Sequence, residues 1–375
     1  KNVHVEFSDL KSASGAVLSK SLMECINTTG VNWIGTPETF TVNVPQKKVQ
    51  AMWCTINIPE DAKADVYSGV AMVSADGEQT TSVKISLKIN NTIAKDHGVN
   101  EPWKQTRLTW LNSTLYEKNT VIPPYIPLHK TGNEISLLGR KVTLDKTGFP
   151  LQLQSFFTQE MTGIGAQPKD LLAESIHFHF AKSDGKEIKF TSSPIDYTEQ
   201  TEGSYSWQVK NASPEIEMDV NGSLEFDGFM NYTVKVIALQ DVDFKGITMH
   251  VPFQPDVAKY LLGLGYEGQK RPDSVAWKWN VATKNQDGAW VGDVNAGLQV
   301  SLRDQHYVRP LNTNFYLQKP LLLPISWGNE NKGGINIWLK GKSVLMDNYS
   351  GARSMMKGDT LYYNFRMLFT PFHTL

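Results

Sequence analysis

The residues with the most suggestive chemistry lie in the stretch AWKWNVATKNQDGAWVGDVNAGLQVSLRD, residues 276–304. Three tryptophans stand there close to aspartate and asparagine side chains. A flat aromatic ring can stack on the C–H face of a sugar, while carboxylates and amides pair with its hydroxyls. The predicted carbohydrate-binding residues are Trp277, Trp279, Trp290, Asp293, Asn295 and Trp327. Tryptophans buried in a sandwich core would explain the same pattern, and that alternative stays open.

Histidines supply a second group of candidates. His177 and His179 in SIHFHF share one face of an expected strand. Two such imidazoles could hold a metal if a carboxylate approached from a neighbouring strand, although the solvent face of an amphipathic strand is the favoured interpretation. His306 and Tyr307 resemble pairs that lyases and mutarotases use for proton transfer. No catalytic residue, metal site or cofactor is predicted.

The stretch GLGYEG, residues 263–268, matches the glycine pattern of dinucleotide-binding loops. Such a loop must lie between a strand and a following helix. Here it follows FQPDVAKYLLGLG, in which Val257, Leu261 and Leu264 have helical spacing and Gly265 can end the helix. We therefore predict one short helix in this segment and a plain loop after it.

Composition limits the partners. The 375 residues include 37 Lys and Arg against 38 Asp and Glu, so nothing in the charge balance favours nucleic acid or an anionic membrane. No apolar run approaches the roughly 20 residues that a membrane helix needs. The chain starts at Lys1 with no visible signal peptide, which would suit an exported protein after processing. Cys25 and Cys54 could form a disulfide in such a protein or remain free on strands.

The first part of the chain is expected to form a small immunoglobulin-like sandwich over residues 1–89. An Asp76-Gly77 turn separates two alternating runs, and the second run places Val83, Ile85 and Leu87 on one face. Residues 90–102 are polar and broken by glycine and proline, as in a linker.

Residues 103–375 are predicted to form a large antiparallel β-sandwich of the supersandwich type, so the whole chain is assigned to the all-β class. Alternation is clear in SLEFDGFMNYTVKVIAL and again in LYYNFRMLFTPFHTL at the end of the sequence. In the latter, Tyr363, Phe365, Met367 and Phe369 share a face, and Pro371 should end the pairing.

Five segments together resemble the N-terminal β region of bacterial enzymes related to glycoside hydrolase family 123. They are TRLTWLNSTLYEKNTVIPPYIPL, AWVGDVNAGLQVSLRD, RPLNTNFYLQKPLLLP, SWGNENKGG and LYYNFRMLFTPFHTL. The resemblance spans about residues 100–375. It implies a large β-sandwich that leads into a C-terminal (β/α)8 catalytic barrel of the same polypeptide. The start at Lys1 adds the expectation that the protein is exported to the periplasm or cell surface.

That family's activity, as the resemblance implies it, is β-N-acetylgalactosaminidase chemistry in which the acetamido group of the substrate attacks the anomeric carbon. A consecutive Asp-Glu pair in the barrel assists the reaction. This sequence contains no consecutive Asp-Glu, so no catalytic residue is carried over. The leading hypothesis is a non-catalytic β region that supports the barrel and contacts bacterial or host glycans containing N-acetylgalactosamine. Alternatives are a stand-alone carbohydrate-binding module and a β-sandwich lyase or epimerase.

Overall fold

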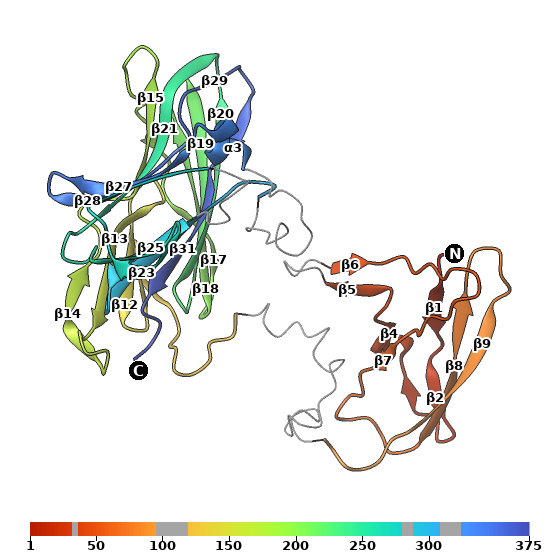
Figure 1. Cartoon of the computed structure of the whole chain (residues 1–375). Helices are drawn as coiled ribbons and strands as arrows, with labels where there is room; N and C mark the ends of the chain where they lie inside the picture. Colours follow the sequence, from red (N-terminus) through yellow and green to blue (C-terminus); the bar gives the residue numbers. More distant parts are fainter. Residues whose placement is uncertain (32–36, 95–118, 280–287, 308–323, 375) are drawn as a thin grey trace. The chain divides into compact units, whose positions relative to one another are not determined.

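The chain forms two compact units, residues 1–118 and 119–375. The computed structural model (Figure 1) describes residues 1–31, 37–94, 119–279, 288–307 and 324–374. Nearly all regular structure in these ranges is β-strand, and every strand pairing is antiparallel, which confirms the all-β prediction. Within the described ranges, the helices are all too short or too polar to cross a membrane.

The first unit contains nine strands in its described residues: β1 (His4–Phe7), β2 (Leu10–Ser12), β3 (Val17–Leu18), β4 (Met23–Cys25), β5 (Thr29–Val31), β6 (Pro37–Thr39), β7 (Cys54–Ile56), β8 (Val66–Ser74) and β9 (Thr81–Lys88), with a 3-10 turn η1 (Lys20–Leu22). β8 is the central strand, because it pairs with β9 along one edge and with β1 and β2 along the other. The predicted hairpin turn at Asp76-Gly77 joins β8 to β9, and Gly77 has a φ of 76°.

The core of the first unit is small. Its buried members are Leu10, Leu18, Met23 and Tyr67. Ile85 and Leu87 of β9 pack against them as expected, but Val83 of the same strand is 51 % exposed. The immunoglobulin-like assignment stays a prediction, as do the boundaries at residues 90–102, most of which lie outside the described residues.

The described residues of the second unit form three sheets. The first has the order β10-β11-β12-β13-β14. Its strands are β10 (His129–Thr131), β11 (Glu134–Leu137), β12 (Arg140–Leu144), β13 (Pro150–Phe157) and β14 (Ile164–Asp170). The second has the order β15-β21-β28-β27-β24, with β29 also on β21. Its strands are β15 (His177–Lys182), β21 (Val242–Phe253), β24 (Ser274–Lys278), β27 (Gly334–Lys340), β28 (Ser343–Tyr349) and β29 (Arg353–Met355).

The third and largest sheet has the order β16-β18-β19-β20-β31-β26-β25-β22-β23, with β17 on β18 and β30 on β20. Its strands are β16 (Thr191–Ser192), β17 (Asp196–Gln200), β18 (Ser204–Ala212), β19 (Ile216–Glu225), β20 (Phe229–Ala238), β22 (Tyr260–Gly263), β23 (Tyr266–Lys270), β25 (Gly288–Asp293), β26 (Ala296–Arg303), β30 (Thr360–Tyr362) and β31 (Asn364–Thr370).

One continuous hydrophobic core joins these sheets. Phe149, just before β13, packs within 5.5–6.1 Å, between ring centroids, of Phe178 in β15, Tyr232 in β20 and Phe365 in β31. Alternate residues of the long strands point into this core, because successive side chains of a strand face opposite sides. The arrangement is that of the predicted large antiparallel sandwich.

The terminal strand is formed as predicted. Tyr363, Phe365, Met367 and Phe369 are fully buried or nearly so, and β31 ends at Thr370, directly before Pro371. Arg140 at the start of β12 adds a polar contact to this region. Its guanidinium is buried and donates to the backbone carbonyls of Asp227, Phe369 and Phe372.

The helix predicted over FQPDVAKYLLGLG is wrong. The segment makes one turn, in which the Ala258 N–H donates to the Gln254 carbonyl, and then joins the third sheet as β22. Gly263, Leu264 and Gly265 all have positive φ and form the turn to β23, so a helix cannot continue there. In the described residues the short α-helix is α3 (Ile325–Gly328), followed by the 3-10 turn η5 (Asn329–Asn331).

Candidate functional site

Three of the predicted carbohydrate-binding tryptophans lie in the core. Trp277, Trp279 and Trp327 are 2 %, 6 % and 0 % exposed. The rings of Trp277 and Trp279 meet edge to face with 4.9 Å between centroids, and Trp327 packs on Tyr363 at 4.8 Å. A sugar can stack only on an accessible ring face. None of these three rings is exposed, so the burial of the side chains does not support glycan contact by them, and that contact stays a prediction.

Trp290 is half-buried in β25 and lies across neighbouring glycines. Its indole Nε1 donates to the Thr370 hydroxyl at 2.8 Å. A Cβ added at Gly297 would come within 2.5 Å of the ring, and one at Gly292 within 2.6 Å. The glycines around Trp290 are therefore explained by the packing of this ring.

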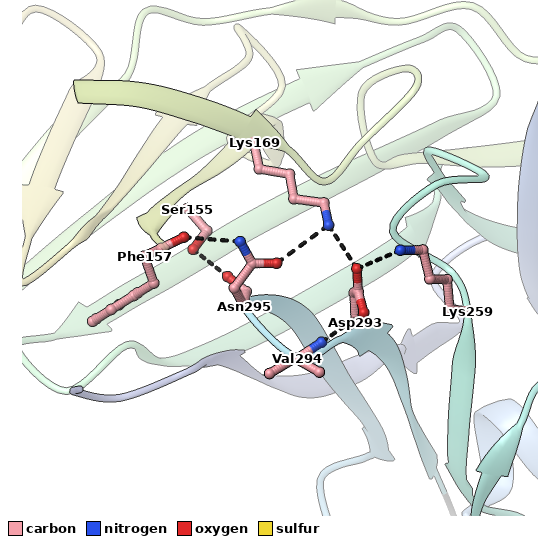
Figure 2. A network of polar contacts seen from close by, with 7 residues as sticks. All are labelled: Ser155, Phe157, Lys169, Lys259, Asp293, Val294 and Asn295. Atoms are coloured by element: carbon pink, nitrogen blue, oxygen red, sulfur yellow. Dashed lines mark hydrogen bonds and ion pairs between the residues drawn. The ribbon is translucent and has the colours of Figure 1, made fainter. Parts of the chain in front are cut away.

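Asp293 lies at the centre of an ion-pair network (Figure 2). Its Oδ2 is 2.7 Å from Nζ of Lys169 and 2.8 Å from Nζ of Lys259, and its Oδ1 accepts the N–H of Val294 at 2.9 Å. The carboxylate is 3 % exposed, whereas Lys259 is 49 % exposed. Burial alone would raise the pKa of Asp293, but the two lysines and the N–H hold it at about 2.

Asn295 links the same network to the first sheet. Its Oδ1 accepts from Lys169 at 3.2 Å, and its Nδ2 donates to the Phe157 carbonyl at 2.8 Å. Ser155 of β13 in turn donates to the Asn295 carbonyl at 2.5 Å (Figure 2). The structure thus brings the predicted pair Asp293 and Asn295 together, and both side chains hold the β25–β26 turn against β13 and β14.

A second polar cluster crosses the second sheet. The strand register places His177 of β15 opposite His250 of β21, and His250 opposite Asp347 of β28. The His250 ring lies 5.0 Å from the His177 ring and 5.7 Å from the His179 ring, measured between centroids. His250 Nδ1 is 2.5 Å from Oδ1 of Asp347. We call His177, His179, His250 and Asp347 the histidine row.

His179 meets a carboxylate as well, since its Nε2 is 3.0 Å from Oε1 of the exposed Glu187. In the part of the chain that the structure describes, no group of three or more His, Cys, Asp or Glu side chains is placed to hold a metal ion. Hydrogen bonding and proton transfer are the chemistry that the side chains of the histidine row offer.

A pocket of about 240 Å³ opens beside Asp347. Its lining residues are Lys245, Gly246, Thr248, Asn336, Asp347, Tyr349 and Gly351. Polar residues and one aromatic residue therefore line a space somewhat smaller than the roughly 300–1,000 Å³ that is typical of ligand pockets. Burial raises the pKa of Tyr349, so its hydroxyl remains a donor near neutral pH.

His306 and Tyr307 are not part of this pocket's lining. Tyr307 is 5 % exposed and packs edge to face on Trp279 at 5.9 Å between centroids. The backbone N–H groups of both residues donate to Asp304 Oδ1. A lyase or epimerase would need His177, His306 or Tyr307 in a shared pocket, and none of the three lines the pocket beside Asp347.

The sequence interpretation missed His250 and Asp347. Alternation in GITMHVPF does place His250 on the polar side of its strand, which is a usable signal. Asp347, in contrast, directly follows the apolar residues Val344, Leu345 and Met346, and its partner His250 lies 97 residues away in the chain. Only the pairing of β15, β21 and β28 brings these side chains together.

Comparison with known proteins identifies the family. Residues 128–371 match the family model described as glycoside hydrolase 123, third domain. The match covers more than half of the chain, so the chain belongs to glycoside hydrolase family 123. No curated protein matches it.

Several solved structures of sugar-related proteins align at low similarity. A galactose mutarotase related enzyme from Lactobacillus acidophilus aligns with a TM-score of 0.36 at 10 % identity, covering 66 % of this chain and 98 % of that one. A putative aldose 1-epimerase from Escherichia coli K12 gives 0.35 at 9 % identity over 65 % and 98 %. Heparan sulfate lyase from Pedobacter heparinus gives 0.35 at 6 % over 64 % and 34 %. At these TM-scores the likeness carries no argument about this chain.

Proposed function

We propose that this chain is the non-catalytic β region of a bacterial, exported family 123 glycoside hydrolase. It would support a C-terminal catalytic barrel of the same polypeptide that acts on bacterial or host glycans containing N-acetylgalactosamine. The observation that carries the proposal is the family match over residues 128–371. It is supported by the absence of a consecutive Asp-Glu pair from the sequence. The balanced charge favours a glycan partner over nucleic acid.

The polar pocket beside Asp347 is the proposed place of glycan contact. Asp347 and Asn336 offer a carboxylate and an amide, and Tyr349 offers an aromatic ring and a hydroxyl within the same lining. These are the groups that hydrogen-bond and pack against a sugar. The volume of about 240 Å³ suits one terminal sugar unit rather than a long chain segment. The buried tryptophans predicted for this role offer no comparable surface.

Titration of the chain with an oligosaccharide that ends in N-acetylgalactosamine tests this contact. We expect saturable binding, and a loss of at least about tenfold in affinity for Tyr349→Phe and Asp347→Asn, which corresponds to ~1.4 kcal/mol. Glu330→Gln is the matched control, because its side chain is 85 % exposed and it is not a lining residue. Equal affinity in all three variants would place the contact elsewhere.

Proton-transfer chemistry of a lyase or epimerase is the second candidate. The short contact between His250 and Asp347 favours it, since a carboxylate that orients an imidazole makes it a better general base. Assays of sugar mutarotation and of β-elimination from a uronate-containing oligosaccharide test this candidate. Turnover that is lost in His250→Gln would support it and would argue against a purely non-catalytic role.

A further inference from the structure

Cys25 and Cys54 are direct neighbours in the first unit. Cys25 ends β4, Cys54 begins β7, and the register of this two-stranded sheet pairs the two residues with each other. Both thiols are free in the structure; Cys25 is buried and Cys54 is exposed. The sequence leaves a disulfide and two free thiols as alternatives, and the pairing of β4 with β7 is what brings the two residues together.

The hydrogen bonds around the pair define its geometry. The Ile26 N–H donates to the Trp53 carbonyl at 3.0 Å, and the Asn57 N–H donates to the Leu22 carbonyl at 2.8 Å. Bonded and non-bonded pairs alternate along an antiparallel ladder. Because 22–57 and 26–53 are bonded pairs, the pair of Cys25 and Cys54 is a non-bonded one.

Side chains are closest at non-bonded positions, where Cα atoms are typically about 4.5 Å apart. A disulfide requires Cα atoms roughly 4.4–6.8 Å apart, so this position meets the requirement without a change in strand register. We propose that Cys25 and Cys54 form a reversible disulfide that bridges β4 and β7. The reaction partner is a small disulfide oxidant of the glutathione type.

The exposures of the two thiols set the order of steps. The accessible Cys54 thiolate attacks the oxidant, forms a mixed disulfide and releases one thiol. The Cys25 thiolate then attacks the Cys54 sulfur, expels the second thiol and closes the bridge. Two protein thiols lose two electrons and two protons, and one oxidised small disulfide becomes two reduced thiols.

We expect the unreacted pair to oxidise slowly. Burial and the adjacent Cys25 thiol raise the pKa of Cys54 to about 11, so its thiolate is scarce near neutral pH. The reduced pair should therefore persist during purification and close when a disulfide oxidant is supplied. The bridge would then restrict residues 25–54 in the unfolded chain, which stabilises the first unit.

Equilibration of the folded full chain in a graded series of reduced and oxidised glutathione tests the proposal, with thiol counting, intact mass and mapping of linked peptides. We expect the wild type to lose both thiols together and to yield one peptide pair that contains Cys25 and Cys54. The unfolding midpoint of the first unit should rise by roughly 10 °C on oxidation.

Two variants separate the steps. Cys25→Ser should stop at a stable glutathione adduct on Cys54, whereas Cys54→Ser should leave the buried Cys25 unmodified. Peptide mapping of the wild type needs neither variant, so the proposal can be judged even if one of them folds poorly. Wild-type protein that keeps two free thiols under oxidising conditions, accumulates only glutathione adducts, or links cysteines between chains would overturn it.

Discussion

Asp293 is buried and remains ionised because two lysines reach it from opposite sides. Oδ2 of the carboxylate is 2.7 Å from Nζ of Lys169 and 2.8 Å from Nζ of Lys259, and the two lysine side chains are 21 % and 49 % exposed. We predict that Asp293→Asn lowers the free energy of unfolding by about 2 kcal/mol, since hydrogen bonds to charged groups are lost while both lysines can turn to water. Urea denaturation measures the change.

Glu330→Gln is the control for that substitution. Glu330 is 85 % exposed and lies 3.5 Å from Lys332. An exposed ion pair contributes little, so we expect a change below about 0.5 kcal/mol. A similar loss in both variants would show that the Asp293 network adds nothing beyond an ordinary surface pair.

The pH dependence of stability follows from the same carboxylate. Its pKa is lowered from 3.8 to about 2 in the folded chain. The folded state therefore binds this proton less readily than the unfolded state, so the stabilisation is complete above pH 4 and is lost as the pH falls through about 2. Denaturation midpoints between pH 6 and 2 should fall more steeply for the wild type than for Asp293→Asn. Parallel profiles would contradict the lowered pKa.

Residue types alone identified part of these sites. The proximity of Asp293 and Asn295 in the sequence drew attention to a polar cluster that does exist. The lysines that complete it could not be found this way, because Lys169 lies 124 residues from Asp293 and comes from another sheet. The role of the tryptophans stayed ambiguous for a similar reason, since burial depends on strands far away in the chain.

At the scale of elements, strand alternation was predictable and the local turn geometry was not. Met230, Tyr232, Val234 and Val236 of β20 are all buried as their period of two predicted. The FQPDVAKYLLGLG segment has helical spacing, yet a turn and a strand bury Val257, Leu261 and Leu264 while Leu262 is 50 % exposed. Pairing of β22 with both β23 and β25 decides the outcome.

The β25–β26 hairpin depends on close packing between Trp290 and its glycines. We predict that Gly297→Ala destabilises the chain by about 2 kcal/mol, because the added methyl would meet the indole ring at 2.5 Å. Gly246→Ala in β21 is the matched control, since a Cβ there meets nothing within 4 Å. Thermal unfolding of both variants gives the comparison, and equal midpoints would refute the packing argument.

At the scale of the whole molecule, the fold class could be predicted and the sheet order could not. Runs of alternating residues separated by turns indicate antiparallel sheets. The order of strands in the second sheet joins segments as distant as β15 and β28 through β21, and no local pattern encodes this. The histidine row and its pocket are products of that order.

Membership of glycoside hydrolase family 123 indicates that this β-rich chain is part of a glycoside hydrolase. The resemblance attributes the chemistry to a carboxylate pair in a catalytic barrel, and this sequence lacks the consecutive Asp-Glu motif. Glycan contact and support of the catalytic part therefore remain as the proposed contributions of this chain.

Hydrolysis of a chromogenic N-acetyl-β-galactosaminide by the purified chain is the most direct test of the account. The rate is measured at high protein concentration against buffer and against the His250→Gln variant. We expect no release of chromophore above the buffer rate for either protein. Release that scales with the concentration of the wild-type chain would contradict it, and loss of that release in His250→Gln would move the catalytic role to the histidine row.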